Sequence, residues 1–318
     1  MSKTRYCFAS VCVDSEIPLP LLPSHPDGGS AELTLIDAGS TNALPSCWSL
    51  ADLVVNPSSD DGGLELWRSE EQYLLRYIRS FDLVFSPSNR IAHIFLDPES
   101  DRATVEHLLL DQAVPRILGH FGHLMLHASA VEVDGRALCF VAPSGAGKST
   151  LAAMLAATGR RVLADDVVRV DLADSGVVIH PGYPSLRLWA DSALFLRPGQ
   201  VVNHARMAEY SSKRVYRLGE ESSGFGTCAL AALILLSDRD GDHGATPHLR
   251  SLPPAAALMR LMAQSFALHV GESRMLRDRL RRMAAVCTVS QPRELVFARD
   301  YAARQDLLQA LRPVLGSS

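Results

Sequence analysis

The chain has 318 residues, 47% of them hydrophobic, and its 31 basic and 35 acidic residues give a net charge of −4. This length predicts two domains or one large one, and the hydrophobic content argues against long disordered regions. The charge balance provides no general attraction to nucleic acid or to an anionic membrane, so we expect neither as a partner.

The cysteines and the apolar runs predict a soluble, cytoplasmic protein. None of the six cysteines forms a C-x-x-C pair, which fits a reducing compartment. The longest strongly apolar run, residues 229–236, is far shorter than the roughly 20 residues that span a bilayer. Asp14 and Glu16 interrupt the apolar stretch near the N-terminus, so no signal peptide is predicted.

Residues 1–100 are interpreted as a β-rich domain that acts as a scaffold or docks a substrate, because no catalytic motif occurs there. Turn-forming residues separate its apolar runs, for example at 25–29 and 57–63. Short apolar or alternating runs predict strands at 6–13, 31–37, 64–68, 73–78, 81–85 and 91–96.

A second, catalytic domain is predicted over residues 101–318. The spacing of its first apolar residues predicts a helix over 103–119 that Pro115 kinks or ends. Asp134-Gly135 is a strong hairpin signal between two apolar runs. Strands are predicted at 124–133, 136–141, 177–180, 186–189, 215–218 and 230–236, and helices at 254–265, 274–285 and 301–311.

Residues 140–150, Phe-Val-Ala-Pro-Ser-Gly-Ala-Gly-Lys-Ser-Thr, fit the phosphate-loop pattern G-x-x-x-x-G-K-[ST], except that Ala142 replaces the first glycine. A buried strand precedes this loop and a helix over 149–157 follows it, so the positive end of the helix points at the phosphates. We expect Lys148 to reach the β- and γ-phosphates and Ser149 to ligate Mg²⁺. The predicted ATP-binding residues are Ser144, Gly145, Ala146, Gly147, Lys148, Ser149 and Thr150.

Two adjacent acids, Asp165 and Asp166, end a short apolar strand at 161–166. P-loop proteins place an acid beside the metal at such a position. One carboxylate can hold Mg²⁺ while the other accepts a proton from an attacking hydroxyl, since repulsion separates their pKa values. The alternative is a polar turn that ends the strand. From the residues alone, His127 in the preceding apolar strand is better explained as a core histidine than as a catalyst.

Together these segments resemble the catalytic domain of HPr kinase/phosphorylases. The resemblance implies an α/β fold with a P-loop kinase core of the HPr kinase/PEP carboxykinase type and a smaller β-rich N-terminal domain. It implies that Asp165 is the general base, that His127 tunes it, and that Asp166 lies near the metal with Ser149. The matching stretches are His127-Ala-Ser-Ala-Val-Glu-Val-Asp-Gly-Arg, Pro143-Ser-Gly-Ala-Gly-Lys-Ser and Leu163-Ala-Asp-Asp-Val.

The chain departs from the HPr-phosphorylating members after the aspartates. Their glutamate- and glycine-rich segment is replaced by His180-Pro-Gly-Tyr-Pro-Ser-Leu-Arg-Leu-Trp, which contains no second acidic metal ligand. Residues 6–20 instead resemble bacterial kinases found with ribosomal peptide tailoring. These are similar to the lasso-peptide kinases, which phosphorylate a serine of a precursor peptide.

The predicted function is therefore an ATP- and Mg²⁺-dependent serine kinase that acts on a peptide or protein, such as a lasso-type precursor. A small-molecule kinase on the same fold and a nucleotide-sensing regulatory ATPase are the alternatives, and the aspartate pair favours a transferase. Arg187, Lys213 and Arg214 are candidates for holding phosphate or a substrate carboxylate, although Lys213 and Arg214 fit a solvated basic loop equally well. The sequence does not decide between a monomer and a homo-oligomer.

Overall fold

The computed structural model describes residues 3–24, 30–41, 48, 53–55, 63–69, 71–183, 185–219, 226–237, 246–268, 273–298 and 304–315. The turns predicted at 25–29 and 57–63 lie outside these ranges, apart from Gly63. None of the helices in the described ranges has the length and hydrophobicity of a membrane span.

The chain is mixed α/β and forms two compact units. The first comprises Met1–Val114 and Arg206–Lys213, and the second comprises Pro115–Ala205 and Arg214–Ser318. The predicted domain boundary at residue 100 precedes this division, because helix α1 (Arg102–Leu108) belongs to the first unit.

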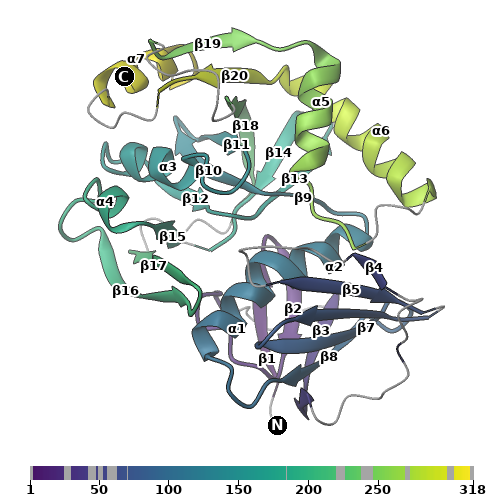
Figure 1. Ribbon diagram of the computed structural model, residues 1–318. Coiled ribbons are helices and arrows are strands. Elements are labelled where there is room, and N and C mark those ends of the chain that lie inside the picture. The colour runs from purple at the N-terminus through teal and green to yellow at the C-terminus, as the bar shows by residue number, and fades with distance from the viewer. Residues whose placement is uncertain are drawn as a thin grey trace. The chain divides into compact units, whose positions relative to one another are not determined.

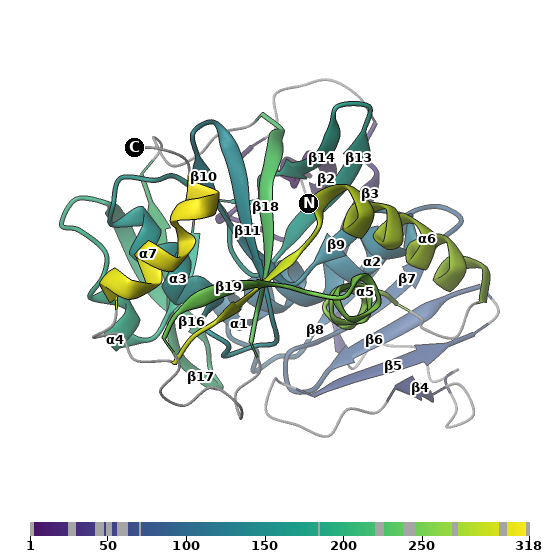
Figure 2. The same ribbon diagram turned by 90° about the horizontal axis from the view of Figure 1, so that it is seen from above.

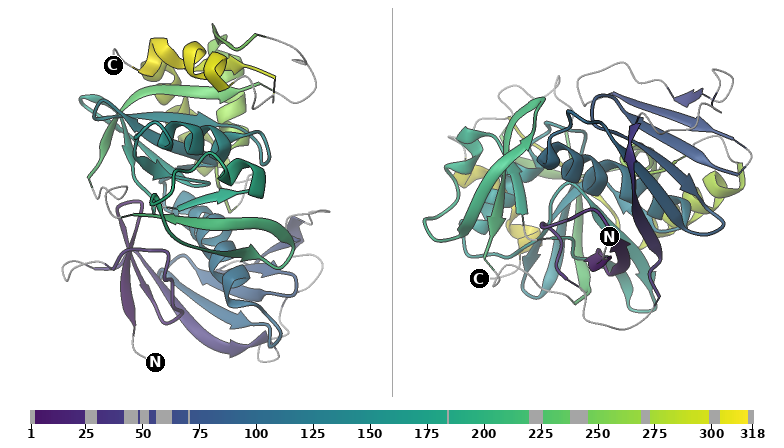
Figure 3. Two further views of the ribbon diagram at one scale, coloured as in Figure 1. Left: turned by 90° about the vertical axis from the view of Figure 1, so that its left-hand side faces the viewer. Right: turned by 90° about the horizontal axis from the view of Figure 1, so that it is seen from below.

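The first unit is built on one eight-stranded sheet, drawn in purple to blue in Figure 3. Strand β3 runs parallel to its neighbours β2 and β8, and the other neighbours are antiparallel. The strands predicted at 64–68, 73–78, 81–85 and 91–96 are confirmed. The sheet order is β1 (Thr4–Phe8), β2 (Val11–Ser15), β3 (Leu33–Ser40), β8 (Ile91–Leu96), β7 (Phe81–Ser86), β6 (Tyr73–Tyr77), β5 (Leu64–Arg68) and β4 (Leu53–Val55).

The single strand predicted at 6–13 is wrong, because β1 and β2 form an antiparallel hairpin there. Its turn residues Ala9 and Ser10 have φ values of 48° and 61°. A two-residue turn with both φ values positive matches the twist of the flanking strands. Asparagine and glycine usually mark such a turn, so Ala-Ser gave no sequence signal.

The helix predicted over 103–119 is present in three pieces. α1 passes into a π-helical turn, η3 (Leu109–Ala113), and then into α2 (Val114–His120). The N–H of Val114 donates to the carbonyl of Leu109, five residues back. This wider turn comes directly before Pro115, which has no N–H to continue the α-helical ladder. The proline therefore coincides with a change of helix type.

The second unit is built on a nine-stranded mixed sheet. The strand predicted at 124–133 is broken at His127, because β9 pairs with β13 whereas β10 pairs with β11 and β12. The sheet order is β12 (Val162–Ala164), β10 (Ala128–Val133), β11 (Arg136–Val141), β18 (Cys228–Leu236), β14 (Gly176–His180), β13 (Val168–Ala173) and β9 (Leu124–Leu126), and β20 (Arg293–Val296) pairs with both β18 and β19 (His248–Ser251).

Helices cover both faces of this second sheet. Figure 2 shows α3 (Lys148–Ala156) and α7 (Arg304–Leu315) on one side of β11 and β18, and α5 (Pro254–Ala263) and α6 (Ser273–Ser290) on the other. Successive side chains of a strand point to opposite faces. Accordingly Leu138 and Phe140 of β11 pack with α3 and α7, whereas Cys139 and Val141 pack with α5 and α6.

The helices predicted at 254–265 and 274–285 are thus confirmed. The helix predicted at 301–311 is described only from Arg304 onward.

A third, small sheet has three strands. β15 (Ser185–Leu188) pairs antiparallel with β17 (Ser211–Leu218), which is followed in the sheet by β16 (Val201–Ala208). β15 lies next to α3 and β12, and the short helix α4 (Ala190–Ala193) follows it (Figure 1). This placement brings the end of β15 to the beginning of α3, where the candidate site lies.

A cluster of charged side chains ties β13, β14 and α6 together. One carboxylate oxygen of Asp171 lies 2.6 Å from the Nη2 atom of Arg169 and 2.9 Å from the Nε2 atom of His180. Its other oxygen lies 3.7 Å from Arg282. Burial raises the pKa of Asp171, but His180 and Arg169 outweigh it and lower this pKa to about 2.

Asp171→Asn should lower the free energy of unfolding by about 1–2 kcal/mol at neutral pH, a value reduced for partial exposure. Because the pKa of Asp171 is depressed, its contribution is complete above the ordinary value of 3.8 and is lost as the pH falls toward 2. Denaturant unfolding at pH 7 and pH 2.5 measures the difference. Asp174→Asn, on the exposed turn of the same hairpin, is the control. An equal loss at both pH values would contradict the assignment.

Candidate active site

Strand direction brings the phosphate loop and the two aspartates together. β11 and β12 flank β10, and both run antiparallel to it. Their carboxyl ends therefore lie at the same edge of the sheet, with the loop after β11 and Asp165 after β12 (Figure 1). Since Ala130 pairs with Ala164, Ser129 lies opposite Asp165.

The loop owes its shape to two glycines. Gly145 and Gly147 have φ values of 71° and 100°, which L-residues rarely adopt. Gly147 is also the N-cap of α3, a helix of nine residues. The first N–H groups of a helix have no partner within it, so the start of α3 presents backbone donors next to the loop.

Ala142 can replace the first glycine of the pattern because its backbone is not in the left-handed region. Its carbonyl oxygen accepts a hydrogen bond from the Nζ atom of Lys148 at 2.7 Å, and the carbonyl of Pro143 accepts another at 3.0 Å. The Lys148 ammonium is therefore held over the loop's own carbonyls.

Asp165 is buried at the end of β12 and accepts three hydrogen bonds. The Ser149 hydroxyl donates to its Oδ1 atom at 2.9 Å, and the Ser129 hydroxyl donates to the same oxygen. The main-chain N–H of Arg187 donates to Oδ2 at 2.8 Å. Asp165 thus joins the loop to both β10 and β15.

Asp166 has a left-handed backbone with φ of 65°, which turns its side chain away from that of Asp165. Its Oδ1 atom lies 3.5 Å from the Nε2 atom of His127, and its Oδ2 atom lies 3.3 Å from the Nε atom of Arg187. The structure therefore pairs His127 with Asp166 and Ser149 with Asp165. This is the reverse of the predicted pairing, in which His127 tuned Asp165 and Asp166 lay at the metal with Ser149.

The two carboxyl groups have opposite pKa shifts. Burial, followed by the charge of Asp166, raises the pKa of Asp165, while Arg187 and Ser129 oppose the rise. Burial also favours a higher pKa for Asp166, but His127, Arg187 and Lys148 together hold that pKa well below its usual range. Asp166 therefore stays ionised to a lower pH than Asp165 does.

The segment after α5 fixes the position of His127. Its main-chain N–H donates to the carbonyl of Gln264 at 2.7 Å, and its ring centroid lies 6.4 Å from that of Phe266. Phe266 in turn lies against α2, where a Cβ atom on Gly119 would approach the Phe266 carbonyl oxygen to 2.5 Å. A side chain at Gly119 would therefore displace the segment that holds His127.

The other predicted site residues lie in different parts of the structure. Ser144 is exposed at the tip of the loop, and Ala146 is buried. The Thr150 hydroxyl lies 3.0 Å from the Ser192 hydroxyl of α4. Of the three candidate anion-binding residues, Arg187 lies at the aspartates. Arg214 is exposed on β17 opposite Leu188, and Lys213 belongs to the first unit.

Sequence reasoning missed Ser129, Tyr183 and Ser192. Ser129 is a polar residue among small apolar ones at the start of the matched motif, and this contrast was the available signal. Tyr183 receives a hydrogen bond from the Nη2 atom of Arg187, and Ser192 contacts Thr150. The contact between Thr150 and Ser192 depends on how α4 packs on α3, and no motif in the local sequence marked Tyr183 as the partner of Arg187.

The residues present fit a nucleotide polyphosphate with a divalent cation. The glycines keep side chains away from the loop's backbone donors, and Ser149 and Asp165 present oxygen ligands of the kind that Mg²⁺ prefers. Within the described ranges, no group of three or more His, Cys, Asp or Glu side chains is arranged to bind a metal ion. Mg²⁺ would therefore take further ligands from phosphate and water, as it commonly does.

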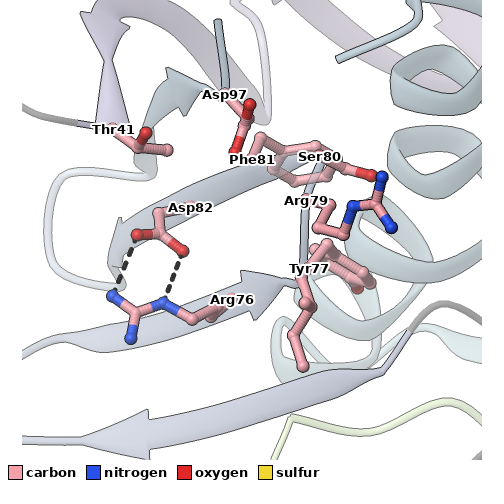
Figure 4. A pocket seen from close by; sticks show the side chains of 9 residues that line it. Thr41, Arg76, Tyr77, Arg79, Ser80, Phe81, Asp82 and Asp97 are labelled. Carbon is pink, nitrogen blue, oxygen red and sulfur yellow. Dashed lines mark hydrogen bonds and ion pairs between the residues drawn. The ribbon is translucent and has the colours of Figure 1, made fainter. Parts of the chain in front are cut away.

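A separate hollow of about 280 Å³ lies in the first unit beside the turn between β6 and β7 (Figure 4). Its wall contains Arg76 and Asp82, which form two hydrogen bonds at 2.9 and 3.0 Å. Arg79 and Asp97 add one further charge of each sign. The hollow therefore has no excess of charge that would select an anion or a cation.

No protein-family model matches the chain, and a search of curated proteins found no match. Among solved structures, the chain is similar to the HPr(Ser) kinase/phosphatase from Coxiella burnetii at 15% sequence identity and a TM-score of 0.23, over 50% of this chain and 88% of that one. A similarity at this level supports no conclusion about activity, so the functional assignment depends on the residues of the site.

Gly147→Ala should weaken ATP binding about 10-fold or more. A left-handed backbone costs alanine about 1–2 kcal/mol, so the loop would shift to a shape that binds phosphate less well. The new Cβ atom would be 3.8 Å from Phe297, an ordinary contact, so strain is the cause rather than a clash. Gly159→Ala is the matched control, since Gly159 has φ of 93° and an open surrounding. Calorimetry should show weaker binding for Gly147→Ala alone, although both variants lose similar stability. Equal affinity in the two variants would count against the loop.

Proposed function

We propose that this chain is an ATP- and Mg²⁺-dependent kinase that transfers the γ-phosphate of ATP to a serine hydroxyl of a peptide or protein. One observation carries the proposal: two adjacent carboxylates at a phosphate loop have different partners, Ser149 for Asp165 and His127 for Asp166. A nucleotide-dependent switch needs an acid beside the metal. A second acid paired with a histidine suits an acceptor whose proton must be removed.

The phosphate loop would bind the nucleotide through the backbone N–H groups of residues 144–150 and the ammonium of Lys148. Bound ATP with Mg²⁺ supplies the phosphoryl group and part of the positive charge that stabilises its transfer. Lys148 lies 2.7 and 3.0 Å from two loop carbonyls, so phosphate oxygens would replace these as its partners. Ser149 and Asp165 would hold the cation.

The proposed roles of the two aspartates are the reverse of those that the family resemblance implies. Asp165 is 2% exposed, and its Oδ1 atom accepts from Ser149, the residue that the phosphate-loop pattern places at the metal. Asp166 has an 18% exposed side chain, so an acceptor hydroxyl can reach it. We therefore assign proton acceptance to Asp166 and orientation of its carboxylate to His127.

The acceptor is proposed from its chemistry and from the resemblance of residues 6–20 to peptide-tailoring kinases. A serine hydroxyl is barely acidic, so its attack on phosphorus calls for a positioned base. A small-molecule acceptor would need the same base, and a regulatory ATPase would transfer phosphate to water. The identity of the group that receives the phosphate therefore distinguishes the three functions.

Asp166→Asn should bind ATP with Mg²⁺ normally and reduce the transfer rate by about 100-fold or more, because it keeps the shape and removes the proton acceptor. Asp165→Asn should instead weaken the binding of ATP in the presence of Mg²⁺. Calorimetry with and without Mg²⁺ and single-turnover transfer measure the two effects. Normal binding with lost transfer in Asp165→Asn alone would restore Asp165 as the base.

Incubation with ATP, Mg²⁺ and the precursor peptide encoded nearest the gene should add one phosphate to a serine, detected by mass spectrometry. The controls are the Lys148→Ala enzyme and a peptide whose serines are replaced by alanine. Phosphate found only on a metabolite would indicate a small-molecule kinase. ATP hydrolysis that no acceptor alters would indicate a regulatory ATPase.

A further inference from the structure

Arg187 is enclosed by the protein. It is the largest side chain in the described ranges that is less than 2% exposed, and its side chain has no exposed area. The sequence suggested that it holds a phosphate or a substrate carboxylate. A guanidinium with no access to solvent could do so only after the surrounding protein moved. The contacts of its side chain in this structure are therefore with other protein groups.

Arg187 contacts both aspartates through different groups. Its main-chain N–H donates to the Oδ2 atom of Asp165 at 2.8 Å. The Nε atom of its guanidinium lies 3.3 Å from the Oδ2 atom of Asp166. The pairing of β15 with β17 holds its backbone and burial restricts its side chain, so Arg187 contacts both carboxylates from a constrained position.

Tyr183 holds the guanidinium in place. Its hydroxyl oxygen accepts a hydrogen bond from the Nη2 atom of Arg187, and its ring centroid lies 5.1 Å from the central guanidinium carbon. Tyr183 is itself 2% exposed. A planar guanidinium that is both stacked and hydrogen-bonded has little rotational freedom, so Arg187 is a rigid reference point.

The carboxylate of Asp166 is thereby oriented from two sides. His127 contacts its Oδ1 atom and Arg187 contacts its Oδ2 atom. Without the arginine, repulsion between the neighbouring carboxylates would favour rotation of Asp166 away from Asp165. Displacement of a catalytic group by about 1 Å can cost about 100-fold in rate.

We propose that Arg187 is a positioning residue that holds Asp165 and Asp166 in their separate orientations and does not touch the substrate. The catalytic consequence rests on the proposed phosphoryl transfer, whereas the coupling between Arg187 and Asp166 is measurable without any activity.

The kinetic test uses Arg187→Met, which keeps the length of the side chain and removes its charge. We expect kcat to fall about 100-fold while KM for ATP and for the acceptor stays nearly unchanged. Tyr183→Phe removes only the hydroxyl and should lower kcat less. Arg277→Met, an exposed change on helix α6, is the control and should have no effect. A raised KM for the acceptor with kcat preserved would overturn the proposal, since it would make Arg187 a substrate ligand.

The thermal test is a double-mutant cycle of Arg187→Met and Asp166→Asn. Arg187→Met should lower the melting temperature strongly when Asp166 is present and only slightly when Asp166→Asn is also present. Additive shifts would overturn the proposal, whether or not the protein transfers phosphate. If Arg187→Met does not fold, a double-mutant cycle of Tyr183→Phe and Asp166→Asn measures the same coupling through the melting temperature. Coupling without phosphoryl transfer in the unaltered protein would overturn the proposed function and leave the role of Arg187 in place.

Discussion

The position of β10 between β11 and β12 is the constraint on which the candidate site depends. Because β10 runs antiparallel to both neighbours, the phosphate loop and the aspartates emerge at the same edge of the sheet. A hydrogen bond of 2.9 Å from Ser149 to Asp165 connects the start of α3 to the end of β12. Ser129 of β10 donates to the same oxygen, so the strand that sets the topology also takes part in the site.

The sequence predicted the parts of this site that are encoded by neighbouring residues. Gly145 and Gly147 mark the loop because their positive φ values exclude most other residues. The Asp134-Gly135 turn was visible for the same reason, with φ values of 50° and 74°. Apolar runs located the strands on either side. The mixed α/β class and most strands and helices of the second unit follow from such short-range signals.

Features that depend on distant contacts were not predictable in the same way. Asp165 and Asp166 are adjacent, and nothing in their order shows which one meets His127 and which one meets Ser149. That choice depends on the left-handed backbone of Asp166, an unusual conformation for which Asp-Asp is no reliable sign. The burial of Arg187 likewise depends on how β15 packs, since an arginine between two leucines looks like a surface residue of a half-buried strand.

Gly119 restricts which residues position 119 can accept. It lies in a helix remote in sequence from the loop, yet no side chain fits between it and the carbonyl of Phe266. The same segment, through Gln264, anchors His127. Even alanine at this position would need a compensating change in the segment after α5. The tolerance to substitution is therefore low at a residue that takes no part in the chemistry.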